Sequence, residues 1–129
     1  MRSAYEIVKA HYDASQRGDL PGMLADLAPD AQWVEMDGSL CAGTHVGPDA
    51  VVERVFKVIG AEFAEFGFTL ERLLDAGDDV VAVGGYHGRH RRSGKSFQVR
   101  TVHLWTVKAD KIRRFEQFTD TRRLADVES

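Results

Sequence analysis

The sequence predicts one α+β domain, spanning residues 1–129, in which a long curved sheet forms a cone around three preceding helices. Three observations support this prediction. The length of 129 residues suits a single domain and allows a substantial core without disulfides. Hydrophobic residues recur at helical spacing as far as Gly67 and alternate with polar residues from there to about residue 119. Short turns separate the alternating segments, which indicates an antiparallel meander of neighbouring strands.

The helical part begins with an amphipathic segment over 3–16, whose apolar face carries Tyr5, Val8, Tyr12 and Ser15. Asp19 is expected to cap a short second helix with Pro21 in its first turn. A third helix is expected to begin at 47–49, and a last one after Asp120.

Alternating hydrophobicity and turn residues predict five strands, over 31–36, 68–74, 80–90, 96–107 and 111–119. The glycine-rich connection 37–43 has neither a helical nor a strand period, so we expect a loop there. Because helices come first and the strands mostly later, the sheet is expected to be antiparallel or mixed and to bury itself around a helix.

Composition favours a cytoplasmic protein without a nucleic-acid or membrane partner. A net charge of −3 argues against nucleic acid as the main partner, because nucleic-acid binding normally depends on a net basic surface. Cys41 is the single cysteine, and no apolar run approaches the ~18 residues of a membrane span. The basic cluster at 89–95 surrounds the turn Ser93-Gly94 and is expected to be a solvated hairpin tip. No metal or cofactor is expected, since His87 and His90 lie on opposite faces of a strand.

Local motifs support a family resemblance over nearly the whole chain. They are Tyr12-x5-Gly18-Asp19, the run from Leu27 to Trp33, Gly43-x3-Gly47-Pro48-Asp49-Ala50, Val102-His103-Leu104-Trp105 and the ending Arg114 to Asp120. In this order they resemble the SnoaL-like polyketide cyclase and ketosteroid isomerase-like family, of the nuclear-transport-factor-2-like (cystatin-like) fold. The resemblance implies the cone and an interior pocket. It does not imply one reaction, because this superfamily contains isomerases, cyclases, dehydratases, epoxide hydrolases and binding proteins.

In such a fold the concave sheet face lines the pocket, so strand parity selects the candidate residues. On strand 96–107 the more apolar face is expected to point inward, with Phe97, Thr101, His103 and Trp105 among its members. On the last strand the set Glu116, Phe118 and Asp120 is expected to face the cavity, and Tyr12 and Trp33 complete the pocket wall. This mixture suits a small apolar ligand with one or two polar atoms.

Two acids compete for the role of general base. Asp120 would be desolvated at the apolar end of its strand, and the resemblance to SnoaL-like cyclases implies a catalytic aspartate there. The alternative is that Asp120 only caps the final helix. Glu35 falls, by alignment on Asp30-Ala31 and Gly38, at the position of the isomerases' catalytic aspartate, although a solvent-facing Glu35 is an equal alternative.

The oxyanion partners implied by the isomerase resemblance are not kept. His11 stands at the position of the tyrosine and His103 at that of the protonated aspartic acid, and this departure argues against steroid isomerisation itself. His103 is expected to stabilise a developing oxyanion or orient the acid, and its alternative is a hydrogen-bonded core histidine.

The sequence therefore predicts a protein with a small-molecule pocket, and two functions for it remain open. One is a cofactor-independent isomerase, cyclase or dehydratase that abstracts a proton from an apolar carbonyl compound. The other is a non-catalytic ligand-binding or dimerisation module. Val102 and Leu104 on the convex face predict a homodimer through the sheet.

Overall fold

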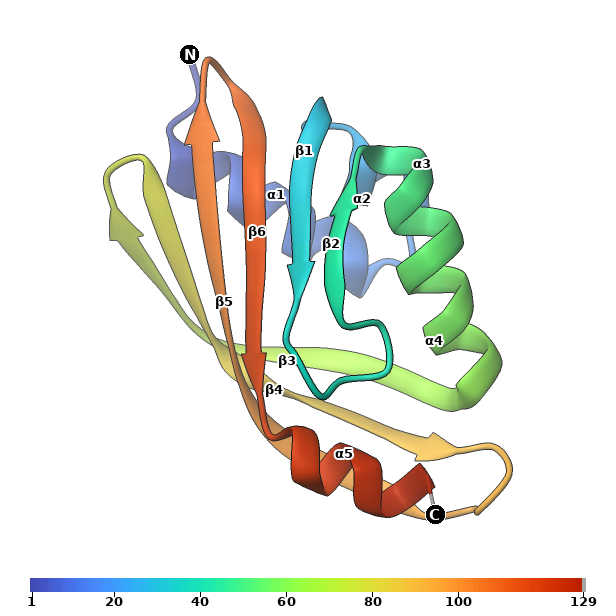
Figure 1. The fold of residues 1–129 in the computed structure, drawn as a ribbon. Coiled ribbons are helices and arrows are strands. Elements are labelled where there is room, and N and C mark those ends of the chain that lie inside the picture. Colours follow the sequence, from blue (N-terminus) through green and yellow to red (C-terminus); the bar gives the residue numbers. More distant parts are fainter. Residues whose placement is uncertain (129) are drawn as a thin grey trace.

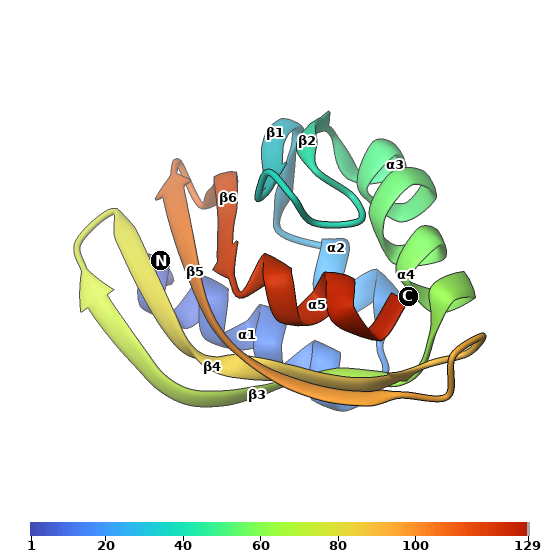
Figure 2. The ribbon, with the colours of Figure 1, turned by 60° about the horizontal axis from the view of Figure 1, so that its bottom comes forward.

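A six-stranded mixed sheet curls around the N-terminal helix (Figures 1 and 2). The computed structural model describes residues 1–128. The strands are arranged in the order β2-β1-β6-β5-β4-β3. Their bounds are β1 (Leu27–Glu35), β2 (Gly43–Val46), β3 (Phe63–Ala76), β4 (Asp79–His90), β5 (Ser96–Lys108) and β6 (Lys111–Thr119). The predicted α+β cone is thus confirmed.

The first two helices begin as expected, and each has a capping side chain at its start. In α1 (Ala4–Gln16) the Ser3 hydroxyl accepts from the Glu6 amide at 3.1 Å, and the Glu6 carboxylate accepts from the Ser3 amide at 2.9 Å. In α2 (Leu20–Leu24) the Asp19 carboxylate accepts from the Gly22 amide at 3.0 Å. The helix α1 lies inside the curl of the sheet (Figure 2). Its residues Ile7 and Val8 are fully buried.

The third helix begins at Pro48 as expected but contains a π-helical turn. It consists of α3 (Pro48–Val51), the π turn η1 (Val52–Phe56) and α4 (Lys57–Glu62). Short π-helical turns are often found at functional sites. Here the turn carries Val55 and Phe56, which both line the interior cavity described below. Within residues 1–128, no helix has the length and hydropathy needed to span a bilayer.

The strands differ from the predicted ones at three places. Strand β1 begins at Leu27, four residues before the predicted start, and ends at Glu35. The loop predicted over 37–43 ends in β2, a strand of four residues that pairs antiparallel with β1. Strand β3 begins at Phe63, directly after α4 and five residues before the predicted start. Its first part contains a bulge, where Glu65 adopts a left-handed φ of 57° and the register shifts between Ala64 and Gly67. Such a bulge breaks the alternation by which a strand is recognised in a sequence.

Strand β1 pairs in parallel with β6, with Trp33 opposite Phe115, whereas the other pairs are antiparallel. The backbones of β3 and β4 approach each other closely at Gly84 of β4. A Cβ atom there would lie 2.1 Å from the carbonyl oxygen of Thr69 on β3, so only glycine fits. The register between β3 and β4 shifts near this point, between Leu70 and Arg72.

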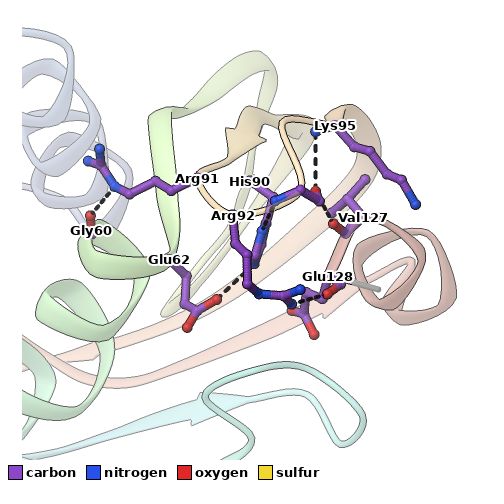
Figure 3. A network of polar contacts seen from close by, with 9 residues as sticks. Gly60, Glu62, His90, Arg91, Arg92, Lys95, Val127 and Glu128 are labelled. Atoms are coloured by element: carbon purple, nitrogen blue, oxygen red, sulfur yellow. Dashed lines mark hydrogen bonds and ion pairs between the residues drawn. The ribbon is translucent and has the colours of Figure 1, made fainter.

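The basic hairpin tip between β4 and β5 has a structural role beyond the predicted solvation. Arg91 Nε donates to the Gly60 carbonyl of α4 at 3.1 Å, while Ser93 Oγ donates to the Val127 carbonyl of α5 (Thr121–Glu128) at 2.5 Å. Arg92 donates to the Glu128 carbonyl (Figure 3). The arginines are exposed, yet the tip caps the carboxyl ends of two helices.

His90 is the buried member of this tip, with 1% of its surface exposed. Its Nδ1 accepts from the Ser93 amide at 3.2 Å, so its Nε2 carries the proton and donates to the Glu62 carboxylate at 2.8 Å (Figure 3). The histidine thereby holds the tip against the end of α4.

Candidate functional site

A cavity of about 310 Å³ lies inside the cone between α1, the helix 48–62 and the concave sheet face. One part of its wall is apolar and is formed by Val55, Phe56, Ile59, Phe66, Phe68 and Phe115. The polar part is formed by His11, Tyr12, Trp33, Glu35, Tyr86 and His103. None of the described side chains that line the cavity is a lysine or an arginine. A mostly apolar wall with a few convergent polar groups is typical of a small-molecule site.

Glu35 lies at the end of β1 and is 4% exposed. Its carboxyl accepts two hydrogen bonds, from Trp33 Nε1 at 3.1 Å and from Gln117 Nε2 at 3.2 Å. Burial raises the pKa of Glu35 to about 7, and these two hydrogen bonds offset only part of that rise. The carboxyl is therefore able to take up and release a proton near neutral pH.

Gln117 of β6 connects this carboxyl to a tyrosine. Its side-chain oxygen accepts from the Met36 amide at 3.3 Å, which defines the orientation of the Gln117 amide. The NH₂ group then donates to Glu35 Oε1 and, at 2.9 Å, to the Tyr86 hydroxyl oxygen. A single side chain thus positions both a candidate base and a candidate hydrogen-bond donor.

His103 of β5 lies between two tyrosine hydroxyls. Its Nδ1 is 2.5 Å from the Tyr12 oxygen, and its Nε2 is 2.7 Å from the Tyr86 oxygen. At the far end, Trp105 Nε1 donates to the Tyr12 oxygen at 2.9 Å. The Phe68 ring stacks on His103 with a centroid separation of 4.4 Å. We call Tyr12, His103 and Tyr86 the relay.

Burial fixes the protonation of the relay. It lowers the pKa of His103 well below the ordinary value, with a smaller contribution from His11, so the imidazole is neutral. Burial also raises the pKa values of Tyr12 and Tyr86, so both hydroxyls keep their protons. The pKa of His11 is lowered to about 4 by burial, and its Nδ1 donates to the Met23 carbonyl at 3.0 Å. His11 therefore lines the cavity as a neutral imidazole that is fixed to the end of α2.

The structure brings together part of the predicted site. Tyr12, Trp33, Glu35 and His103 line the cavity, so the solvent-facing alternative for Glu35 is excluded. The inward face of β5 has the predicted parity, with alternate residues from Phe97 to Val107 buried. Of that face, however, only His103 reaches the cavity. The others do not: Phe97 packs at the far end of the cone, Thr101 bonds to Thr119, and Trp105 lies beneath Tyr12.

The inward parity predicted for the last strand is wrong. Phe118 is 41% exposed, and Glu116 lies on the outer face, where it pairs with Arg114 at 2.7 Å. Asp120 is exposed and accepts from the Arg123 amide at 3.0 Å, which makes it the cap of α5. The desolvation on which a role for Asp120 as base depended is missing.

The physical reason is a bulge in the hairpin between β5 and β6. Lys108 pairs with Lys111 across the turn, and counting outward from this pair would set His103 opposite Glu116. The register shifts by one residue between Thr106 and Val107, so His103 stands opposite Gln117 instead. A shift of one residue exchanges the two faces of a strand. Gln117 was missed for this reason.

Tyr86 was also missed, although its strand was predicted correctly. It has the same parity as the buried residues Val80 and Ala82, which is the signal that could have identified it. Phe68 was assigned to a strand but not to the cavity, because the curl that brings β3 over α1 is not visible in the sequence.

A larger hollow of about 820 Å³ is an open groove outside the cone, between β4, β5 and α5. Its wall includes Glu65, Arg89 and Arg123, of which Arg89 and Glu65 face each other at 3.9 Å. The groove contains no buried carboxyl and no part of the relay. We therefore take the smaller interior cavity as the candidate site.

Comparison with known proteins agrees with this cavity-forming fold. The SnoaL-like domain family matches residues 8–115, which is most of the chain and includes Glu35, Tyr86 and His103. The chain belongs to the SnoaL-like family. The resemblance predicted from the motifs is thereby confirmed.

Three relatives of this SnoaL-like protein illustrate the range of similarity. A crystal structure of an NTF2-like protein from Burkholderia thailandensis is 49% identical, with a TM-score of 0.98 over 100% of this chain and 99% of that one. TerC, co-crystallised with polyporic acid, is 26% identical, with a TM-score of 0.87 and 98% of both chains covered. An uncharacterised protein of Mycobacterium tuberculosis is 32% identical over 114 residues, which cover 88% of this chain and 86% of that protein.

Proposed function

We propose that this SnoaL-like protein is a cofactor-independent enzyme of the isomerase, cyclase or dehydratase type, which abstracts a proton from a small apolar carbonyl compound. One observation carries the proposal: a buried carboxyl with a pKa of about 7 lines the cavity and shares the Gln117 amide with a tyrosine hydroxyl. Glu35 is the proposed base.

In the proposed reaction, the Glu35 carboxylate takes the proton from a carbon next to the substrate carbonyl. The electron pair of the broken C–H bond forms a C=C bond, and the carbonyl π electrons move onto oxygen to give an enolate. A tyrosine hydroxyl of the relay donates a hydrogen bond to this oxygen. Protonated Glu35 then returns the proton to the same carbon or, in a conjugated enolate, to another. A base with a pKa near neutrality performs both transfers efficiently.

The size and charge of the cavity support a small neutral substrate. A volume of about 310 Å³ is at the lower end of the ~300–1,000 Å³ common for ligand sites, which suits a molecule of one or two rings. No lysine or arginine among the described lining residues could neutralise an anionic ligand. The co-crystal of TerC with polyporic acid supports a small organic molecule as the class of ligand.

Deuterium exchange tests the proposal without knowledge of the natural substrate. Cyclohexanone, 1-tetralone, 2-tetralone and 2-decalone are incubated with the protein in D₂O, and proton NMR follows the loss of the signals next to the carbonyl. We expect catalysed exchange with at least one ketone and a rate that rises through about pH 7. Glu35→Gln is expected to reduce the rate by ~10²-fold or more.

Glu116→Gln is the matched control, because it removes a carboxyl on the outer face of the neighbouring strand and should leave exchange unchanged. Equal rates in Glu35→Gln and the unmodified protein would contradict the role of Glu35. Ketones that bind the cavity but exchange only at the buffer rate would favour the alternative, a non-catalytic ligand-binding module.

We also propose a homodimer through the outer sheet face. Val83, Val102 and Phe118 are direct neighbours across β4, β5 and β6, and they form an apolar row on that face. Phe118 is 41% exposed in the single chain, which favours burial against a second copy. Sedimentation equilibrium should give the dimer mass, and Phe118→Glu should give the monomer. A monomer mass for the unmodified protein at micromolar concentration would contradict this proposal.

A further inference from the structure

The relay has a fixed hydrogen-bond donor at each end. Trp105 Nε1 can only donate, and it donates to the Tyr12 oxygen at 2.9 Å. Gln117 Nε2 donates to the Tyr86 oxygen at 2.9 Å, in an orientation set by the Met36 amide. Each tyrosine oxygen therefore already accepts one hydrogen bond before its contact with His103 is considered.

The neutral imidazole of His103 has one N–H donor and one bare nitrogen acceptor. It contacts both tyrosines, at 2.5 Å and 2.7 Å, so it donates to one and accepts from the other. If Nε2 carries the proton, His103 donates to Tyr86 and Tyr12 donates to Nδ1. If Nδ1 carries it, the two tyrosines exchange roles. In both cases one tyrosine proton is used within the relay and the other has no acceptor there.

We infer that the relay presents a single tyrosine hydroxyl proton to the cavity, and that the tautomer of His103 determines whether Tyr12 or Tyr86 presents it. Both tyrosines line the cavity. His103 is thus a positioning residue, which acts through the two tyrosines. The alternative of two free hydroxyls requires an imidazolium, which burial disfavours.

This inference deepens the proposed function and rests on it for the choice of ligand. The relay can serve one acceptor oxygen at a time, so it favours a compound with a single carbonyl over one that places acceptor oxygens against both tyrosines. The Nε2–H tautomer is the one suited to the proposed reaction, because it frees the Tyr86 proton, and Gln117 ties Tyr86 to Glu35.

Nitrogen NMR of the full chain tests the inference. The histidine rings are labelled with ¹⁵N, the His103 signals are assigned with His103→Asn, and 1-tetralone is the probe because it has one acceptor oxygen and no donor. We expect one protonated and one bare ring nitrogen from pH 6 to pH 8, with and without 1-tetralone. We also expect 1-tetralone to shift both signals toward one tautomer.

Two matched variants make the prediction directional. With 1-tetralone bound, Tyr12→Phe leaves only Tyr86 to donate and should give the Nε2–H tautomer. Tyr86→Phe leaves only Tyr12 and should give the Nδ1–H tautomer. The same tautomer in both variants would overturn the inference, as would two protonated nitrogens in the complex or no response of His103 to 1-tetralone.

If one variant fails to fold, the unmodified protein still tests the inference. The inference requires one protonated and one bare ring nitrogen in His103, and it requires both signals to respond to 1-tetralone. Failure of this inference is distinguishable from failure of the proposed function. Glu35→Gln removes the proposed base but no relay group, so it should lose exchange and keep the His103 signals. A wrong relay pattern with intact exchange would overturn the inference alone.

Discussion

Replacement of Glu35 by glutamine should have a more favourable effect on the free energy of unfolding at pH values above 7 than at pH 5. The folded state raises the pKa of Glu35 from the ordinary value of 4.5 to about 7, chiefly through burial. Each pKa unit corresponds to about 1.4 kcal/mol. The ionised carboxyl therefore lowers the free energy of unfolding by about 3 kcal/mol at pH values above the folded pKa.

The sign follows from proton binding. Between pH 4.5 and about 7, the folded state binds the Glu35 proton more tightly than the unfolded state does. The stability contribution of that proton is full below pH 4.5 and is lost as the pH rises through about 7. Buried His11, with a pKa lowered to about 4 in the folded state, acts in the opposite direction below its ordinary value of 6.5. The stability of the unmodified protein as a function of pH consequently combines the opposing contributions of Glu35 and His11.

Comparison of the variant with the unmodified protein isolates Glu35, because His11 and His103 are common to both. Urea unfolding at pH 5 and pH 8 gives the stability difference at each pH. We expect this difference to change by about 2.5 kcal/mol in favour of Glu35→Gln between the two values. Any fixed effect of the altered hydrogen bonds to Trp33 and Gln117 cancels in this comparison. A change below about 0.5 kcal/mol, or one equalled by Glu116→Gln, would refute the reasoning.

Three further predictions concern other parts of the molecule. Gln117→Leu removes an N–H donor to the carboxylate and should move the pKa of Glu35 above 7 in a ¹³C NMR titration; an unchanged or lower value would contradict the contact. Gly84→Ala should destabilise the protein by about 3 kcal/mol in urea unfolding, because the added Cβ atom would clash with the β3 backbone. The control Gly60→Ala adds a Cβ atom in open space on a helix and should stabilise the protein by about 0.5–1 kcal/mol. Similar effects at both sites would contradict the close approach of the backbones at Gly84. Ser93→Ala removes the hydrogen bond to the Val127 carbonyl and should lower the local stability of α5 by about 1 kcal/mol, which would speed amide hydrogen exchange there about fivefold. Unchanged exchange would contradict the capping role of Ser93.

Local signals made much of the fold predictable. Ser3 and Asp19 mark helix starts, and the alternation from Phe97 to Val107 identifies the buried face of β5. These features depend on neighbours a few residues away, so the sequence contains them directly. The family motifs extend over longer distances and add the order of the elements, which supports the cone.

The rest of the site depends on geometry that local patterns do not contain. A one-residue bulge between β5 and β6 determines that Gln117, and not Glu116, faces His103. The same shift places Asp120 outside the cavity, although its residue type and its place at the strand end favoured it as a base. The alternation along β4 indicates that Tyr86 is buried, but it does not contain the hydrogen bonds of Tyr86 to His103 and Gln117, which lie on two other strands.

The parallel pairing of β1 with β6 has a consequence for how the chain folds. Glu35 and its donor Gln117 are 82 residues apart in the sequence. Because bringing such distant segments together costs much chain entropy, we expect their contact to form late in folding. The meander of β3 to β6 can form from segments that follow one another in the sequence. Strand β1 comes from the N-terminal half and can join the sheet only by pairing with β6, the last strand of the chain. We expect the carboxyl to lose its water at the same late step that supplies its hydrogen-bond donor. The folding route would then spare the growing core an unpaired charge, and a chain that lacks β6 would leave Glu35 hydrated and without its raised pKa.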